Sequence, residues 1–259
     1  PQPSTNGGVV MDGWGGLHWF GGKPANLSGS AYWPGWDIAR GVALRSDRTG
    51  GYTLDGFGGL HSFGTAPAVT SSAFWPFWDI ARGLALCGDE KSGYTLDGFG
   101  GLHQFGSAPA VPNSSHDYWA GWDIARSVTV KADCQGGYLM DGFGGVHNFG
   151  DAAPIANSTH AYWPGWNIAR SMVLRADGAS GYILDGWGGV HPFGGAPATT
   201  PSAYWGGWDI ARSMTLAADG RSGYVLDGWG GVHPFGATPA VTFEQYWPGW
   251  DIANGAGGA

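Results

Sequence analysis

Apolar and polar positions alternate in short runs along the whole chain, and glycine-rich segments separate the runs. In the run at 213–218, Met214 and Leu216 fall on one face, which is typical of a half-buried β-strand. A hairpin signal, a second apolar run, a glycine-rich turn and a third short run follow at 219–220, 224–226, 227–231 and 232–235. This stretch therefore predicts three short antiparallel strands.

The same pattern occurs six times. The phrase Asp-Gly-Trp/Phe-Gly-Gly-Leu/Val-His-x-Phe-Gly begins at Asp12, Asp55, Asp97, Asp141, Asp185 and Asp227, at intervals of 43, 42, 44, 44 and 42 residues. A second phrase, aromatic-Trp-x-x-Trp-Asp/Asn-Ile-Ala, follows each copy of the first and predicts an outer strand or a turn. Because the period runs through the chain without a linker, we expect one domain, 1–259, with repeats at about 7–50, 51–92, 93–136, 137–180, 181–222 and 223–259.

Three or four short strands per repeat of about 43 residues predict an all-β fold, a six-bladed β-propeller. A helical solenoid would need amphipathic segments with a 3.6-residue period, and the sequence has none. The first strand of the pattern is clear in only five copies, at 41–46, 83–88, 127–132, 171–176 and 213–218. We therefore expect the C-terminal segment 254–259 to pair with the N-terminal hairpin and close the ring, although its glycines make it a poor strand former.

The run Ala-Asp-Gly-x-x-Gly-Tyr-Val-Leu-Asp-Gly-x-Gly-Gly-Val-His-x-Phe resembles the hairpin core of NHL-type six-bladed propellers. The aromatic, glycine-rich repeats are also similar to those of tachylectin-2-like propeller lectins, which have longer repeats and five blades. The second phrase and the fixed Asp–His pair depart from NHL repeats. The resemblance thus implies the fold more strongly than any activity.

Composition narrows the possible partners. The chain has 20 acidic against 12 basic residues and a net charge of −8, and it contains no basic run, which excludes a nucleic-acid-binding surface. No apolar stretch is long enough to predict a membrane span. Few lysines, polar loops and 16 tryptophans favour a secreted, extracellular protein. The two cysteines, Cys87 and Cys134, occupy equivalent turns of successive repeats and either form a disulfide or remain free thiols.

Each repeat holds an aspartate and a histidine six residues apart. The pairs are Asp12/His18, Asp55/His61, Asp97/His103, Asp141/His147, Asp185/His191 and Asp227/His233. They are either six ligand sites or buried, hydrogen-bonded pairs that fix the blade geometry, and we favour the structural role. Each pair offers only two metal ligands, whereas zinc needs three or four. Six histidines converging on a central channel could coordinate a metal, but we predict no metal and no cofactor.

The second phrase carries an aspartate and, three residues later, an arginine. These pairs are Asp37/Arg40, Asp79/Arg82, Asp123/Arg126 and Asp209/Arg212, with Asn167/Arg170 and Asp251/Asn254 as variants. We interpret them as ion pairs that join blades. The two tryptophans of this phrase, Trp33 and Trp36 in the first copy, are expected to fill the space between blades.

The aromatic residues of the glycine-rich turns are the candidate glycan-binding residues. They are Trp14, Phe57, Phe99, Phe143, Trp187 and Trp229, each between glycines. An aromatic residue between glycines either packs onto a neighbouring blade or lies accessible at a hairpin tip, where a pyranose ring can stack on its face beside polar groups.

The sequence therefore predicts a secreted, multivalent, lectin-like module that is not an enzyme. A rigid protein–protein scaffold, or a targeting subunit of a larger secreted assembly, is the alternative. An enzyme ranks third, because no set of catalytic residues breaks the repeat. His116 and His160 lie outside the repeated pattern in variable loops, where we expect them to be solvated.

Overall fold

The repeats form six three-stranded antiparallel sheets in a computed structural model that describes residues 7–23 and 27–258. The strands are β1 (Gly7–Asp12), β2 (Leu17–Gly21), β3 (Ala39–Leu44), β4 (Gly50–Asp55), β5 (Leu60–Gly64), β6 (Ala81–Leu86), β7 (Gly93–Asp97), β8 (Leu102–Phe105), β9 (Ala125–Val130), β10 (Gly136–Asp141), β11 (Val146–Gly150), β12 (Ala169–Leu174), β13 (Gly181–Asp185), β14 (Val190–Phe193), β15 (Ala211–Leu216), β16 (Gly223–Asp227), β17 (Val232–Phe235) and β18 (Ala253–Gly258). Two short 3-10 helices, Asn113–Ser115 and Asn157–Thr159, lie in loops.

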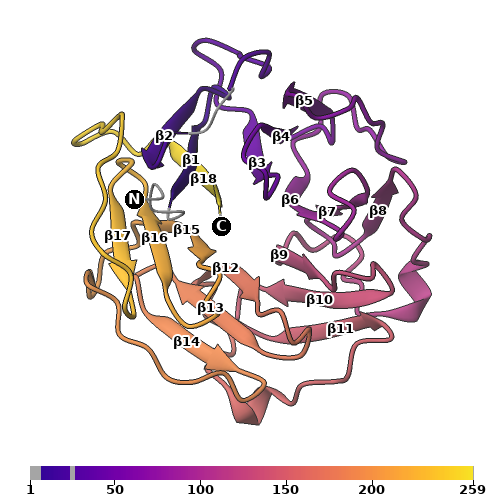
Figure 1. Cartoon of the computed structure of the whole chain (residues 1–259). Coiled ribbons are helices and arrows are strands. Elements are labelled where there is room, and N and C mark those ends of the chain that lie inside the picture. Colours follow the sequence, from indigo (N-terminus) through magenta and orange to yellow (C-terminus); the bar gives the residue numbers. More distant parts are fainter. Residues whose placement is uncertain (1–6, 24–26, 259) are drawn as a thin grey trace.

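The six sheets stand around a common centre like the blades of a propeller (Figure 1). One strand of each sheet lies toward the centre, and these inner strands are β3, β6, β9, β12, β15 and β18. The expected six-bladed β-propeller is therefore confirmed. Five sheets take their inner strand from the sequence just before their middle strand, and the sheet of β1 and β2 takes β18 as its inner strand, so sheets and sequence repeats are offset from one another.

The middle strands form the core, because each is covered on both faces by neighbouring sheets. All six residues of β4 are buried. Tyr52 of β4 packs against Phe105 of the next sheet, with ring centroids 6.1 Å apart. Gly51 leaves room for the ring of Phe63 from β5, since a Cβ at this position would overlap that ring and the backbone of β3. This explains why every residue of the strand is buried, instead of every second one.

Strands from the two ends of the described chain close the ring. β18 pairs antiparallel with β1, with Val9 opposite Gly257 and Val10 opposite Ala256. Figure 1 shows the yellow β18 beside the indigo β1. The expected pairing of the C-terminal segment with the N-terminal hairpin is thus confirmed up to Gly258, and Ala259 lies outside the described residues.

One local expectation needs correction, and one alternative is settled. The inner strands begin two residues earlier than predicted, at Ala39 instead of 41 in the first copy. The reason is that Ile38 and Ala39 donate backbone hydrogen bonds to the carbonyl of Gly13 in the preceding turn, which starts the strand inside the second phrase. Of the two alternatives given for the rest of that phrase, an outer strand or a turn, the structure shows the turn, with the Trp36 amide donating to the Trp33 carbonyl.

A disulfide joins Cys87, just after β6, to Cys134 in the turn between β9 and β10. It crosslinks two neighbouring blades and resolves the choice that the sequence left open. Within the described ranges, no helix is long and apolar enough to cross a membrane.

Candidate functional site

The repeated aspartate closes the glycine-rich turn at the end of each middle strand. In the fifth repeat, Asp185 is 7% exposed, and its Oδ1 accepts hydrogen bonds from the amides of Trp187 and Gly189 at 2.8 and 2.9 Å. Its Oδ2 is bonded to Nε2 of His191 at 2.7 Å. A buried carboxylate with this many partners holds the turn in shape.

The same three contacts occur in all six repeats. The turn amides contact Oδ1 of the aspartate at 2.7 to 3.0 Å in the other five copies. The Asp–His hydrogen bonds of those copies join Asp12 to His18, Asp55 to His61, Asp97 to His103, Asp141 to His147 and Asp227 to His233. The hydrogen-bonded pairs expected from the sequence are therefore present in every blade.

The histidines of these pairs are less buried than expected. The aspartates are buried, but the histidine side chains are between 17% and 34% exposed. The six half-buried histidines are His18, His61, His103, His147, His191 and His233. The reason is that they lie on β2, β5, β8, β11, β14 and β17, the outer strands of the six sheets, which are only partly covered. The expectation of a buried pair is thus correct for the aspartate and wrong for the histidine.

The repeated histidine connects one blade to the next. The ring of His191 lies edge-on to Trp163 of the preceding phrase at a centroid distance of 5.0 Å. Equivalent contacts join His18 to Trp247, His61 to Trp33, His103 to Trp75, His147 to Trp119 and His233 to Trp205. Because they sit on outer strands, the six histidines do not surround the central channel as the metal-binding arrangement would require. The described residues contain no group of three or more metal-ligating side chains.

His147 differs from the other five because a second carboxylate reaches it. Its Nε2 is 2.9 Å from Asp141 and its Nδ1 is 2.6 Å from Asp117. Burial alone would lower the pKa of His147, but the two carboxylates outweigh it and raise the pKa above its usual value. The second carboxylate belongs to a variable loop, so this contact is made in one blade only.

The two loop histidines also differ from expectation. His116 and His160 are half-buried instead of solvated. Their Nε2 atoms donate to the carbonyls of Gly100 and Gly144 in the glycine-rich turns. They therefore hold their loops against neighbouring turns.

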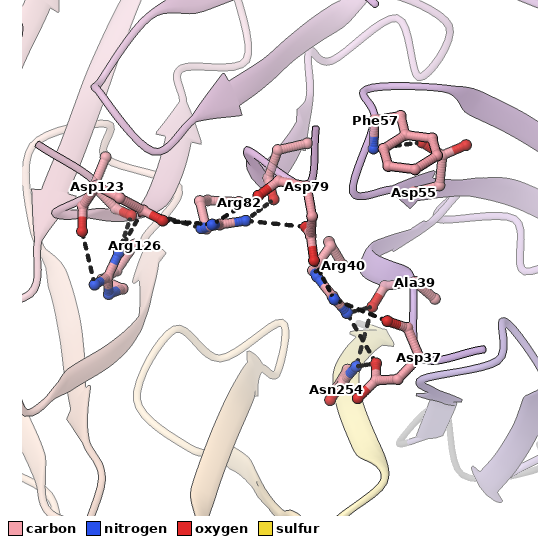
Figure 2. Close-up of polar contacts among 12 residues, drawn as sticks. Asp37, Ala39, Arg40, Asp55, Phe57, Asp79, Arg82, Asp123, Arg126 and Asn254 are labelled. Atoms are coloured by element: carbon pink, nitrogen blue, oxygen red, sulfur yellow. Dashed lines mark hydrogen bonds and ion pairs between the residues drawn. The ribbon is translucent and has the colours of Figure 1, made fainter. Parts of the chain in front are cut away.

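The arginines of the second phrase form a ring of interblade ion pairs at the inner strands. Arg40 donates from Nε and Nη2 to the carboxylate of Asp79 in the next blade, and from Nη1 to Asp37 at 2.9 Å. The same bidentate contact runs from Arg82 to Asp123, from Arg170 to Asp209 and from Arg212 to Asp251. Figure 2 shows the arc of this ring from Asp123 to Asn254. The predicted joining of blades by ion pairs is confirmed.

The arginine ring surrounds the mouth of a central cavity of about 180 Å³ that is lined by all six inner strands. The glycine-rich turns lie at the same face of the propeller. Gly13 of the first turn donates to the Ile252 carbonyl, and a Cβ at Gly56 would overlap the carboxylate of Asp79. One face therefore carries both the charged ring and the turn aromatics.

The second tryptophan of each second phrase is an exposed aromatic that recurs in every repeat on this face. These residues are between 43% and 52% exposed and are Trp36, Trp78, Trp122, Trp166, Trp208 and Trp250. Each lies edge-on to the turn aromatic of a neighbouring repeat, as Trp208 does to Trp229 at 5.1 Å. We call each such tryptophan and its turn aromatic an aromatic site. The expectation that both tryptophans fill the space between blades is wrong for the second one, because the turn directs it outward.

The candidate glycan-binding residues named from the sequence are half-buried members of these sites. Trp14, Phe57, Phe99, Phe143, Trp187 and Trp229 all have intermediate exposure. Where the turn aromatic is a tryptophan, a tyrosine joins the site, and Tyr204 lies 6.4 Å from Trp187. Sequence reasoning found the inner half of each site and missed the exposed half.

Phe77 makes one aromatic site unlike the others. It occupies the position between Pro76 and Trp78 where the other five repeats have glycine. Phe77 has a φ of 65° and is 93% exposed, and its ring lies 6.2 Å from Phe57. Because the other five copies have glycine at this position, the sequence alone could have marked Phe77 as an exception.

Comparison with known proteins supports the fold alone. No protein-family model and no curated protein sequence matches the chain. Among solved structures, a chain of the nidogen/laminin complex is similar, with a TM-score of 0.58 and 11% identity over 97% of each chain. A functionally unknown protein from Desulfotomaculum acetoxidans is also similar, with a TM-score of 0.51 and 14% identity over 97% of this chain and 98% of that one. A protein of unknown function from Bacteroides thetaiotaomicron has a TM-score of 0.51 and 10% identity over 94% of this chain and 68% of its own.

The propeller with its repeated surface groups is suited to a binding module or a scaffold. The repeated Asp, His and Arg side chains are engaged in holding turns or joining blades, as His191 and Arg40 are, whereas the second tryptophans are open to solvent.

Proposed function

We propose that the protein is a non-enzymatic, multivalent carbohydrate-binding module that acts outside the cell. The observation that carries this proposal is the set of six equivalent aromatic sites on one face, each with a tryptophan that is 43% to 52% exposed. Burial of a tryptophan side chain against a ligand contributes much of the binding energy. Six exposed tryptophans at equivalent positions therefore favour a binding surface.

The geometry of one aromatic site fits a pyranose ring. The exposed face of Trp208 offers a flat apolar surface for the CH groups of a sugar, and Trp229 supports it edge-on from the next turn. The phrase continues directly into Asp209, whose carboxylate is 43% exposed and can accept hydrogen bonds from hydroxyl groups. Apolar stacking beside a few polar acceptors is the usual composition of a sugar site.

Six weak sites on a rigid ring gain strength through multivalency. A polysaccharide or a glycan-covered surface presents many copies of the same sugar, so occupation of one site raises the effective concentration at the others. The extracellular location is supported by the disulfide between Cys87 and Cys134, since such bonds persist in oxidising compartments. The non-enzymatic role is supported by the sixfold repetition of the Asp–His pairs, because catalysis needs one asymmetric set of groups.

A pull-down on immobilised polysaccharides tests the proposal after a glycan array has identified a ligand. We expect Trp208→Ala alone to weaken retention modestly. Replacement of all six second tryptophans by alanine should weaken it by about a hundredfold or more, because avidity is lost together with the individual contacts. Retained binding in the sixfold variant would place the glycan elsewhere and contradict the proposal.

Two matched controls separate loss of stacking from loss of folding. The corresponding tryptophan-to-phenylalanine variants keep an aromatic face and should retain most of the binding. Arg221→Ala changes an exposed residue of the β15–β16 hairpin, at the opposite end of the strands, and should bind as the parent protein does. Release of new reducing ends from the bound polysaccharide would show hydrolysis and contradict the proposal that the protein is not an enzyme.

A protein-binding scaffold is the second candidate function, and Phe77 favours it. A strained phenylalanine that is 93% exposed beside the half-exposed Phe74 and Trp78 gives one blade an apolar surface that the others lack. If the protein is a scaffold, we expect Phe77→Gly to abolish binding of the protein partner and to leave polysaccharide retention unchanged. Loss of polysaccharide retention alone would assign Phe77 to the glycan site.

A further inference from the structure

The charged ring at the channel mouth leaves no hydrogen-bond donor free where an arginine meets two carboxylates. Arg40 places Nε and Nη2 on Asp79, Nη1 on Asp37 and on the carbonyl of Ala39, and a second Nη2 hydrogen on the carbonyl of Asp37. A guanidinium has five N–H donors, so all of those on Arg40 are satisfied. The ring thus has no capacity for a ligand at this point.

Asn167 breaks the alternation of charges between Arg126 and Arg170. Nε of Arg126 donates to Oδ1 of Asn167 at 3.3 Å, but its Nη2 donates only to the backbone carbonyl of Asp123 among the described residues. In the equivalent contact of the preceding blade, Nη2 of Arg82 also reaches the second carboxylate oxygen of its partner.

The amide of Asn167 presents a donor where the aspartates of the ring present an acceptor. Oδ1 of Asn167 lies against Gly142 as Oδ1 of Asp79 lies against Gly56. The Nδ2 group of Asn167 therefore occupies the position of a carboxylate Oδ2 and faces Nη2 of Arg126. Two donors that face each other without an acceptor between them are unfavourable unless an anion or water bridges them.

Arg170, on the other side of Asn167, likewise meets one carboxylate instead of two, that of Asp209. Nη1 of Arg126 reaches a carboxylate, that of Asp123, at 3.1 Å. Nη1 of Arg170 reaches only the carbonyls of Asn167 and Ala169 among the described residues. Burial lowers the pKa of the Arg126 guanidinium, and repulsion from neighbouring arginines adds to the effect of burial. Two guanidinium groups therefore flank a neutral side chain.

The arginines on both sides of the break line a cavity of suitable size. The central cavity has a volume of about 180 Å³, and Arg126 and Arg170 line it together with the other three arginines of the ring. Since a water molecule takes about 30 Å³, this volume holds a small hydrated oxyanion.

We propose that the arc formed by Arg126, Asn167 and Arg170 binds a small oxyanion, a carboxylate, sulfate or phosphate group. Nη2 of Arg126 and Nδ2 of Asn167 donate to its oxygens, and Arg170 supplies the second charge. Charge-assisted contacts of this kind are those for which arginine is suited. The oxyanion site contains none of the aromatic sites, so the oxyanion proposal can be tested independently of glycan binding.

The other break in the ring directs the anion to this arc. Asn254 stands where the sixth arginine would be, and its Nδ2 donates to Oδ1 of Asp37 at 2.8 Å. Asp37 is therefore contacted by one guanidinium, from Arg40, instead of two. The mouth of the channel is acidic near Asn254 and basic near Asn167, so an oxyanion entering it is attracted to one side only.

Isothermal titration of the full chain with sodium sulfate, phosphate and acetate, at constant ionic strength, tests the proposal. We expect saturable binding to the parent protein. Asn167→Asp should weaken that binding by about tenfold or more, since the carboxylate takes the place of the ligand and neutralises the arc. Arg126→Gln should weaken it as well, and it provides a second test if Asn167→Asp fails to fold.

A gain-of-site variant is the matched control. Asp79→Asn places the same amide between Arg40 and Arg82, and we expect it to bind a second equivalent of the oxyanion. Absence of binding in the parent protein, or equal affinity in the parent and Asn167→Asp, would overturn the proposal.

A further comparison distinguishes an oxyanion that is part of a glycan from a free ion. If an acidic oligosaccharide binds the parent protein more tightly than the carboxyl-reduced oligosaccharide does, while the two oligosaccharides bind Asn167→Asp equally, the oxyanion is part of a glycan. Sulfate binding without any preference for the acidic oligosaccharide assigns the site to a free ion. Both results support the site, and they differ only in what delivers the charge.

Discussion

At the scale of single residues, backbone conformation separates Phe77 from the five glycines at the same position of the repeat. Gly165 has a φ of 79°, and a Cβ at this glycine would meet nothing within 4 Å. Space therefore permits a side chain, and the left-handed backbone alone disfavours it. Phe77 adopts the same conformation with no side-chain burial to compensate, which is the pattern expected of a residue kept for a contact outside the chain.

Reciprocal substitutions test this strain. A non-glycine residue in the left-handed region costs about 1–2 kcal/mol, and replacement of glycine recovers about 0.4–1 kcal/mol from the unfolded chain. We expect Gly165→Ala to lower the free energy of unfolding by up to about 1 kcal/mol and Phe77→Gly to raise it by a similar amount. Urea unfolding measures both changes. A destabilised Phe77→Gly would show that the phenylalanine stabilises the fold.

His147 is the residue through which pH acts most specifically on this fold. Its two ring nitrogens contact Asp141 and Asp117, and its pKa is raised because these carboxylates outweigh burial. A raised pKa means that protonation stabilises the folded state. This contribution is complete below the unfolded pKa of about 6.5 and is lost as pH rises through the folded value.

Asp117→Asn removes the carboxylate that distinguishes His147 from the other repeated histidines. We expect the variant to melt at a lower temperature than the parent protein at about pH 6, with the difference shrinking toward about pH 9. Thermal melts across this range measure the effect, and Asp151→Asn, which breaks an exposed pair with Lys131, is the control. A difference that does not change with pH would mean that Asp117 acts without His147 titration.

At the scale of elements, β18 is the strand on which ring closure depends. It supplies the inner strand of the sheet that contains β1 and β2, and three of its six residues are glycine, because its sequence is Ala-Asn-Gly-Ala-Gly-Gly. The strand is therefore held mainly by backbone hydrogen bonds to β1. Phe20 of β2 packs against Tyr224 of the neighbouring sheet at 5.4 Å and helps to hold this sheet in the ring.

A chain that ends at Ala253 tests this role. Without β18, the edge of β1 loses its partner and the buried Val10 and Met11 become accessible from the channel side. We expect a large drop in melting temperature and a broader transition, followed by circular dichroism. An unchanged melting curve would show that the other five inner strands suffice.

The elements were largely predictable from the sequence, and the orientation of the aromatics was not. Strand positions follow from apolar runs such as Tyr224–Leu226, which need burial wherever they occur. Trp33 and Trp36 are the same residue type in the same turn, yet only Trp33 contacts the histidine of the next blade, His61. Their directions depend on backbone hydrogen bonds between repeats, such as that from Ile38 to Gly13, which the local sequence does not specify.

At the scale of the whole molecule, the repeated sequence builds a symmetric ring that two asparagines make asymmetric. The aromatic sites recur in every blade, so their combined strength depends on how many meet the same surface. Asn167 and Asn254 each occur once in the charged ring and give its mouth one basic and one acidic side. The face therefore combines a repeated apolar surface with a charged ring that is interrupted at two positions.

Closure by β18 has a consequence for concentrated protein. A terminal strand bonded mainly through its backbone can be exchanged between copies, because β1 of any molecule offers the same partner edge. We expect brief heating at high concentration, followed by cooling, to produce domain-swapped dimers in which each ring is completed by the last strand of the other. Size-exclusion chromatography measures them, and a disulfide engineered between β18 and β1 should prevent their formation. Such dimers would carry twelve aromatic sites in two linked rings, which makes strand exchange a route to higher valency without any change in sequence.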